Sequence, residues 1–356
     1  MQKAKPSSHL FFADILRAIS IFAVIILHTA SDYVDQYGEI SSSAWWSANI
    51  YNGLVRFCVP MFVLLSGALL LQPGKIVTAK EIFYKRLPRI LIPLAFWSIV
   101  YVLFDNYINH KTVGEINVAQ QLKVFYQGPV VFHLWYLYML TGIYLMYPVI
   151  NIFISVATEK QLRYFLIIWF AANSIIGIIN ILFALDIGID LNFFTGYIGY
   201  FILGYYLLNF NFTAIQLRNA YLLCLAGLVV SIITPFICVL LHFANFTPLV
   251  ESDFTPDIFF TVTGLFLFMK NKIVTGVKSS FVTDIFMAVS KLSFGIYLIH
   301  ILVMRIVFSE KNLYFDKIQA LHPAGLIPLK AIIILILSFT IIKLIRLVPY
   351  LKKVAG

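Results

Sequence analysis

The chain has 356 residues, of which 61% are hydrophobic and only 12% are charged, and its mean hydropathy is +0.91. A soluble domain carries about a quarter charged residues, so this composition excludes an ordinary soluble enzyme and predicts a surface that mostly faces lipid. The formal net charge of +10 requires no nucleic-acid partner, because the basic residues gather in the predicted cytoplasmic loops.

Apolar stretches separated by charged or Pro-, Gly- and Asn-rich breaks recur along the whole chain. Because about 20 apolar residues cross the hydrocarbon layer as a helix, the sequence predicts an all-α polytopic membrane protein. It is expected to have about ten transmembrane helices in a single membrane-embedded domain, residues 1–356. The predicted spans are 10–30, 51–71, 89–108, 131–155, 164–184, 193–210, 219–243, 257–270, 290–308 and 326–346.

The orientation follows from the lysines and arginines. Seventeen of the 26 fall in segments that share one side with the N-terminus, and five fall in the opposite loops. Cytoplasmic loops are enriched in basic residues, so both termini are predicted to be cytoplasmic and the protein to lie in an inner membrane. Asp14 and Arg17 interrupt the first apolar run, which is therefore predicted to be a retained helix rather than a signal peptide.

Three ionisable residues lie in the first predicted span: Asp14, Arg17 and His28. Each costs at least about 2.5–3.5 kcal/mol at the centre of a membrane helix, so a function is expected for them. Asp14 and Arg17 are three residues apart, and the eleven residues from Arg17 to His28 make about three full turns. All three share one helix face, which predicts a polar stripe lining a cavity. The alternative is an Asp14–Arg17 ion pair near the cytoplasmic mouth, with His28 reaching outward.

Arg86 and Arg89 lie one turn apart where the third span begins, next to Pro88. Two guanidinium groups beside the free amides of a helix start predict a phosphate site. Ordinary topogenic charge is the alternative interpretation. The three cysteines show no regular spacing, so neither a disulfide framework nor a metal site is expected.

Aromatic residues and two further histidines mark the fourth and ninth spans. His133, Trp135 and Tyr136 open the fourth span on the predicted outer side, where an aromatic belt is the alternative to substrate contacts. Tyr297 and His300 lie inside the ninth span, where His300 could equally be a packing residue. Further aromatic side chains near the predicted outer mouth could stack on sugar rings: Tyr37, Trp45 and Trp46.

Taken together and in order, these motifs resemble acyltransferase family 3, the integral-membrane O-acyltransferases. The matching motifs are Arg17-x10-His28, Pro60 to Gly67 (PMFVLLSG), Arg86-x-x-Arg89 followed by Pro93, His133-Leu134-Trp135, and Ser293 to His300 (SFGIYLIH). The resemblance covers about residues 10 to 346. Within the family, the chain is most similar to the stand-alone members that acetylate surface polysaccharides, such as those acting on the enterobacterial common antigen.

The resemblance implies a membrane-bound O-acyltransferase. Such an enzyme transfers an acyl group, usually acetyl, from cytoplasmic acyl-CoA to a hydroxyl of a cell-surface or lipid-linked polysaccharide across the membrane. It implies that Arg86 and Arg89 bind the phosphates of acetyl-CoA, and that His28 acts either as general base or as acyl carrier. Arg17 would stabilise the oxyanion or position His28, and Asp14 would hold Arg17.

The resemblance also gives weaker candidate residues and a competing function. His133, Trp135, Tyr136, Tyr297 and His300 are weaker candidates, for contacts with the substrates. The competing function is polysaccharide export without acyl-transfer chemistry, which would need no acyl-CoA site.

Overall fold

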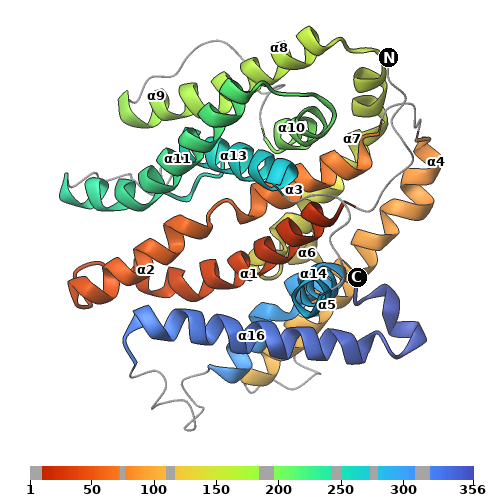
Figure 1. Ribbon diagram of the computed structural model, residues 1–356. Helices are drawn as coiled ribbons and strands as arrows, with labels where there is room; N and C mark the ends of the chain where they lie inside the picture. The colour runs from red at the N-terminus through yellow and green to blue at the C-terminus, as the bar shows by residue number, and fades with distance from the viewer. Residues whose placement is uncertain are drawn as a thin grey trace. The chain divides into compact units, whose positions relative to one another are not determined.

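A computed structural model describes residues 10–72, 77–109, 117–183, 196–241, 250–272, 280–308 and 321–356, with side chains for all of these except 180–183. The described residues form helices and no strand (Figure 1), which confirms the predicted all-α fold. Within these residues, eight helical stretches are long and apolar enough to cross a membrane. The chain is therefore a multi-pass membrane protein.

The helices follow one another with short connections. In chain order the α-helices are α1 (Phe11–Val34), α2 (Ser42–Val55), α3 (Cys58–Leu70), α4 (Ala79–Glu81), α5 (Pro88–Ile108), α6 (Val118–Gln127), α7 (Trp135–Val156), α8 (Glu159–Phe170), α9 (Ile176–Phe183), α10 (Ile198–Asn209), α11 (Ala214–Leu240), α13 (Pro256–Lys272), α14 (Phe281–Val307) and α16 (Pro323–Ile345). Shorter 3-10 and π-helical turns are η1 (Ile82–Arg86), η3 (Phe132–Leu134), η4 (Ala171–Ile175) and η6 (Pro349–Lys353).

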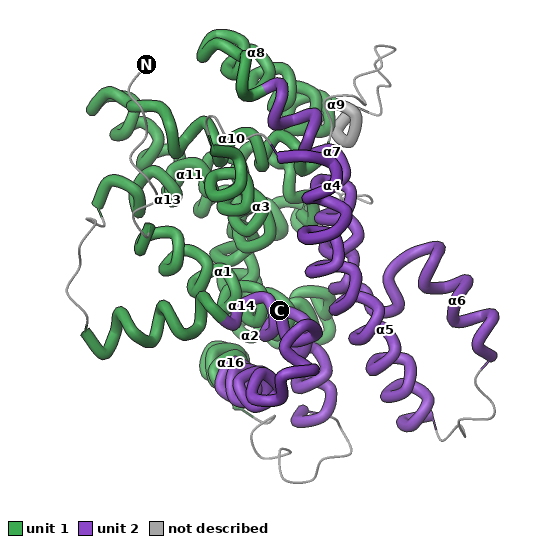
Figure 2. Tube along the Cα trace, turned by 90° about the vertical axis from the view of Figure 1, so that its right-hand side faces the viewer, with its two compact units in different colours: residues 1–75, 154–291, 318–332 green, residues 76–153, 292–317, 333–356 purple. Residues whose placement is uncertain are grey.

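The chain packs into two compact units (Figure 2). Unit 1 consists of residues 1–75, 154–291 and 318–332, and unit 2 of residues 76–153, 292–317 and 333–356. The chain passes between the units within helices α7, α14 and α16, each of which contributes residues to both. Whether the two units behave as the single predicted domain stays a prediction.

Most predicted spans correspond to helices, and two of them differ in an instructive way. The span predicted over 51–71 is two helices, α2 and α3, with Arg56 at the break between them, and it begins at Ser42. The span predicted over 290–308 belongs to α14, which begins nine residues earlier at Phe281. In both cases polar residues in the first turns hid the start of the helix. Serine caps α2, because Ser41 Oγ accepts from the Ala44 amide at 3.3 Å.

Three other regions differ from the prediction. The spans predicted over 193–210 and 257–270 correspond to α10, of 12 residues, and α13, of 17 residues, which are short for a membrane crossing. Helix α6 lies in a stretch for which no helix was predicted. Residues 184, 193–195 and 242–243, at the ends of predicted spans, lie outside the described residues.

Close contact between α3 and α10 organises unit 1. A Cβ atom built on Gly67 would overlap the carbonyl oxygen of Phe201, and one built on Gly204 would overlap that of Leu64. Glycines at such positions let two membrane helices approach until their backbones touch. The Ser66-Gly67 end of the second-span motif therefore has a packing role.

Unit 2 is closed in a similar way around the motif of α14. A Cβ atom on Gly295 would overlap the carbonyl oxygen of Ala355, and Trp97 of α5 donates through Nε1 to the carbonyl of Val354 at 2.9 Å. Residues 354 and 355 are both buried. Gly295 thus makes room for the segment that follows η6.

Candidate functional site

The polar residues of α1 meet a side chain of α14 within unit 1. Arg17 Nη1 lies 3.3 Å from Asp14 Oδ1, as the i,i+3 spacing predicts. The same Arg17 nitrogen donates to Ser290 Oγ at 3.1 Å, and Ser290 Oγ donates to Asp14 Oδ1 at 2.6 Å. A closed triangle of carboxylate, guanidinium and hydroxyl results. It fixes the position of Arg17, whose side chain is still 30% exposed.

His28 lies on the same helix, eleven residues beyond Arg17, which corresponds to about 16 Å along the axis. Its side chain is partly buried. The helix is continuous from Phe11 to Val34, so Arg17 and His28 do share a face, as their spacing predicts. The distance along the axis means that Arg17 does not contact His28 directly.

Arg86 is packed within unit 2 rather than displayed on its surface. It ends the π-helical turn η1, and its guanidinium carbon lies 4.8 Å from the centre of the Tyr147 ring. Its Nη2 lies 3.4 Å from Glu81 Oε1, and the side chain is only 11% exposed. Its Nη1 is buried without a hydrogen-bond partner among the described residues. A buried donor without such a partner is uncommon in a folded protein and requires an explanation, such as a bound water or ion.

Arg89 is exposed in the first turn of α5, directly after Pro88. The two arginines of the predicted phosphate site therefore differ in environment: one is oriented by an aromatic ring and a carboxylate, and the other is accessible. The free amides expected beside them are not present, because both arginines lie inside the helical stretch Ala79–Ile108 and the amides of Leu87, Ile90 and Leu91 are hydrogen-bonded. An anion site here would therefore depend on the two guanidinium groups.

The histidines predicted from the fourth and ninth spans come together in unit 2. The ring centres of His133 and His300 are 5.3 Å apart, and each side chain is 1% exposed. Tyr297 donates through its hydroxyl to the carbonyl of His133. Tyr101 of α5 lies edge-on to His133 at 5.2 Å and donates to the carbonyl of Leu298 at 2.9 Å.

The hydrogen bond of His300 assigns its tautomer. His300 Nδ1 lies 2.6 Å from the carbonyl oxygen of Tyr297. A carbonyl oxygen can only accept, so Nδ1 carries the hydrogen, and in the neutral ring Nε2 has the lone pair. His300 thereby presents Nε2 as a base or hydrogen-bond acceptor.

The predicted aromatic contacts divide between the two units. Trp135 and Tyr136 belong to unit 2, where the ring centres of Tyr136 and Tyr297 are 5.3 Å apart. In unit 1, Trp45 is buried and donates to the carbonyl of Val34 at 3.0 Å, so it is a packing residue. The aromatic side chains on either side of Trp45 are Tyr37 and Trp46.

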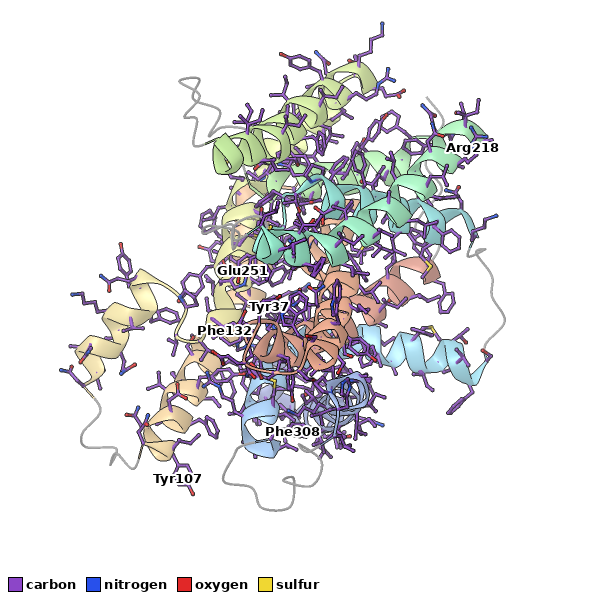
Figure 3. The ribbon with its side chains drawn as sticks, turned by 90° about the vertical axis from the view of Figure 1, so that its left-hand side faces the viewer. Tyr37, Tyr107, Phe132, Arg218, Glu251 and Phe308 are labelled. Atoms are coloured by element: carbon purple, nitrogen blue, oxygen red, sulfur yellow. The ribbon has the colours of Figure 1, made fainter. Side chains whose placement is uncertain are left out.

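Residues of unit 1 that are predicted on opposite sides of the membrane are far apart in the structure. Figure 3 separates Arg218, which directly precedes the predicted span 219–243, from Glu251, which follows that span, and from Tyr37, which follows the predicted span 10–30. Such a separation is necessary for the predicted orientation. The location of both termini stays a prediction.

Sequence reasoning missed four partners of the candidate residues: Ser290, Tyr101, Tyr147 and Glu81. Glu81 had a local signal, since it lies five residues before Arg86. Ser290, Tyr101 and Tyr147 lie far along the chain from the residues they contact, and nothing in their spacing indicates the pairing.

The fold and these clusters define a multi-pass, all-helical membrane protein with buried histidines and arginines. The family described as "Acyltransferase domain" matches residues 10–344. The chain therefore belongs to acyltransferase family 3, and acyl transfer to a hydroxyl is its class of reaction. Neither a curated protein nor a solved structure matches it.

Proposed function

We propose that the protein is a membrane-bound O-acetyltransferase of a bacterial inner membrane. It would transfer acetyl from cytoplasmic acetyl-CoA to a hydroxyl of a surface or lipid-linked glycan. Membership of the acyltransferase family supports the reaction. The observation that supports the donor is the buried Arg86 Nη1, which has no hydrogen-bond partner among the described residues and so suits an anionic ligand.

The donor would be held in unit 2. Arg89 would contact a phosphate of acetyl-CoA directly, because its guanidinium group is exposed. Arg86 would donate from Nη1, while Tyr147 and Glu81 keep its guanidinium in one orientation. The bidentate geometry of arginine suits phosphate better than a lysine would.

His28 would act as the general base on the acceptor. It would take the proton of the acceptor hydroxyl as that oxygen attacks the thioester carbonyl carbon, forming a C–O bond. The C–S bond breaks, and the CoA thiolate receives the proton. Arg17, held by Asp14 and Ser290, lies about 16 Å along α1 from His28, so it would orient the thioester arm of the donor rather than contact the oxygen that His28 deprotonates.

Unit 2 supplies the side chains proposed for acceptor contacts. His300, whose ring is held through Nδ1 by the Tyr297 carbonyl, would contact the acceptor sugar. Trp135 and Tyr136 would pack against sugar rings. His133 packs edge-on against His300 and would keep the His300 ring in its orientation.

The direct test of the reaction is mass spectrometry of surface glycans from cells with and without the gene. An acetyl-sized mass difference that returns on complementation is the expected result. Identical glycan masses, together with intact export of the polymer, would contradict acetylation; export lost with unchanged masses would favour the exporter.

Arg86→Ala and Arg89→Ala are each expected to weaken acetyl-CoA binding by about ten- to a hundredfold, because each removes a charge-assisted contact. Titration of the purified protein with acetyl-CoA measures this. Arg163→Ala is the matched control, since Arg163 is an exposed arginine of unit 1 beside Glu159. Equal affinities in all three variants would leave Arg86 and Arg89 as topology signals.

Ser290→Ala is expected to lower kcat by about tenfold, with little change in KM for acetyl-CoA, because Arg17 loses one of the two groups that position it. Ser290→Thr keeps the hydroxyl and is expected to restore most of the activity. Equal losses in the alanine and threonine variants would mean that Ser290 only fills space.

A further inference from the structure

Unit 1 contains a second group of buried ionisable residues, which the proposed reaction does not use. Arg56, at the break between α2 and α3, is 5% exposed. Its Nη2 donates to the carbonyl of Ser252 at 2.9 Å, and its Nη1 lies 3.8 Å from Asp257 Oδ2. Asp257, in the first turn of α13, accepts from Ser231 Oγ of α11 at 2.5 Å.

A second carboxylate belongs to the same group. Asp253 lies in the connector between α11 and α13, and Tyr197, just before α10, donates to its Oδ2 at 2.5 Å. Tyr200 of α10 donates to the carbonyl of Asp253 at 2.7 Å. The broken span α2–α3 and the beginnings of α10 and α13 are thus tied together by one polar network, in which Arg56 also acts on Asp253 electrostatically.

The charges in this network do not balance. Two carboxylates, Asp253 and Asp257, face one guanidinium, Arg56. Among the residues that the structure describes, the other titratable side chains that interact with Asp253 are Tyr197, Tyr200 and Cys58, and these are neutral at pH 7. A net negative charge held away from water is costly, so one further positive charge is required for neutrality.

We propose that Asp253 is a proton-binding site: a single proton on its carboxyl group, which also accepts the Tyr197 hydrogen bond, balances the Arg56–Asp257–Asp253 network and holds residues 250–255 onto the broken span. The ligand is the proton itself, and the site belongs to unit 1. It is independent of the proposed acetyl transfer.

Two observations support the proton as the missing charge. The 2.5 Å separation between Tyr197 Oη and Asp253 Oδ2 leaves no room for a metal ion between them. Asp253 lies in the connector, outside the candidate spanning helices, and burial raises the pKa of its carboxyl to about 6, although the Tyr197 hydrogen bond and Arg56 lower it.

The sign of the pH dependence follows. An unfolded aspartate has a pKa of about 3.9, so the folded protein holds this proton more tightly than the unfolded chain does. The stabilisation is complete below the unfolded pKa and is lost as the pH rises through about 6. Unit 1 is therefore expected to become less stable between pH 4.5 and pH 8.

A charge-count series tests the site in the full-length protein in detergent, with the heat-unfolding midpoint measured from pH 4.5 to pH 8. Asp253→Asn leaves one carboxylate, Asp257, against Arg56, so the unfolding midpoint of this variant should not fall as the wild-type midpoint does. The difference between the two midpoints, variant minus wild type, is therefore expected to increase by about 4 °C from pH 4.5 to pH 8. Asp257→Asn also restores balance and should flatten the wild-type slope. Asp35→Asn, at an exposed carboxylate, is the control and should follow the wild type.

Two further variants leave the network with charge imbalances of opposite sign. Arg56→Gln leaves two carboxylates, so it should unfold at a lower temperature at pH 8 and recover at pH 4.5. Asp253→Asn combined with Asp257→Asn leaves Arg56 alone and should lower the midpoint by about 10 °C at every pH. Loss of polar contacts alone would lower the midpoint of both variants without this difference in pH dependence, so the two variants together test the effect of charge.

Two results would overturn the proposal. One is a wild-type pH profile parallel to that of Asp253→Asn. The other is an unfolding midpoint at pH 8 that is higher in sodium chloride than in choline chloride at equal ionic strength, for the wild type but not for Asp253→Asn. In that case the missing positive charge would be Na⁺.

Discussion

His28→Ala is expected to abolish acyl transfer while the protein still folds and still binds acetyl-CoA. His28 shares the polar face of α1 with Arg17, and an imidazole is the side chain whose ordinary pKa lies closest to neutral pH. Loss of a general base costs about 10²–10⁴-fold in rate, and more if the imidazole carries the acyl group. Glycan acetylation in cells with matched membrane levels of protein measures the loss.

His28→Gln separates chemistry from hydrogen bonding. Glutamine can replace a hydrogen bond of a histidine at an interface, but it cannot take a proton from a hydroxyl. His322→Gln provides the matched control, because His322 is exposed and bonds Ser43 in the same unit. Substantial acetylation by the His28→Gln protein would remove His28 from the mechanism and direct attention to His133 or His300.

Gly67→Ala is expected to prevent stable packing of unit 1. The added methyl group would overlap the backbone carbonyl of Phe201, which cannot rotate away as a side chain can. Forced separation of α3 and α10 should cost about 3 kcal/mol or more, and Gly204→Ala should act in the same way from the facing helix. The unfolding midpoint and the yield of monodisperse protein in detergent report the effect.

Gly142→Ala in α7 is the control for this prediction. Among the described residues, no heavy atom outside the local helix backbone lies within 4 Å of a Cβ built there, so alanine should be neutral or stabilise the helix by up to about 1 kcal/mol. Similar behaviour of the alanine variants at positions 67 and 142 would show that the contact between α3 and α10 tolerates a side chain.

The sequence predicts the parts of the fold and site that depend on local geometry. Membrane helices follow from composition and length, and the 3.3 Å approach of Arg17 to Asp14 follows from their i,i+3 spacing. The clustering of His133 with Tyr297 and His300 could be suspected only from the family resemblance. Their distance along the chain carries no geometric information.

Two features could not be predicted because they depend on tertiary packing. Tyr147 comes to lie over Arg86 only through the packing of α7 beside η1, so an arginine that reads as a topology signal is in fact buried. Arg56 reads as a residue at the edge of a span, and its partners, Ser252 and Asp257, are about two hundred residues away. Apolar periodicity alone does not reveal a broken helix that is held by such contacts.

The triangle of Asp14, Arg17 and Ser290 has a consequence for how the protein is made. Ser290 follows Arg17 by 273 residues, which a ribosome needs about 14 to 55 s to add at 5–20 residues per second. During that interval α1 must stay in the membrane with its ion pair lacking the hydroxyl that later completes it. Nascent chains that stop before α14 should therefore depend on insertion factors and be degraded by membrane proteases, whereas chains that include Ser290 should escape both.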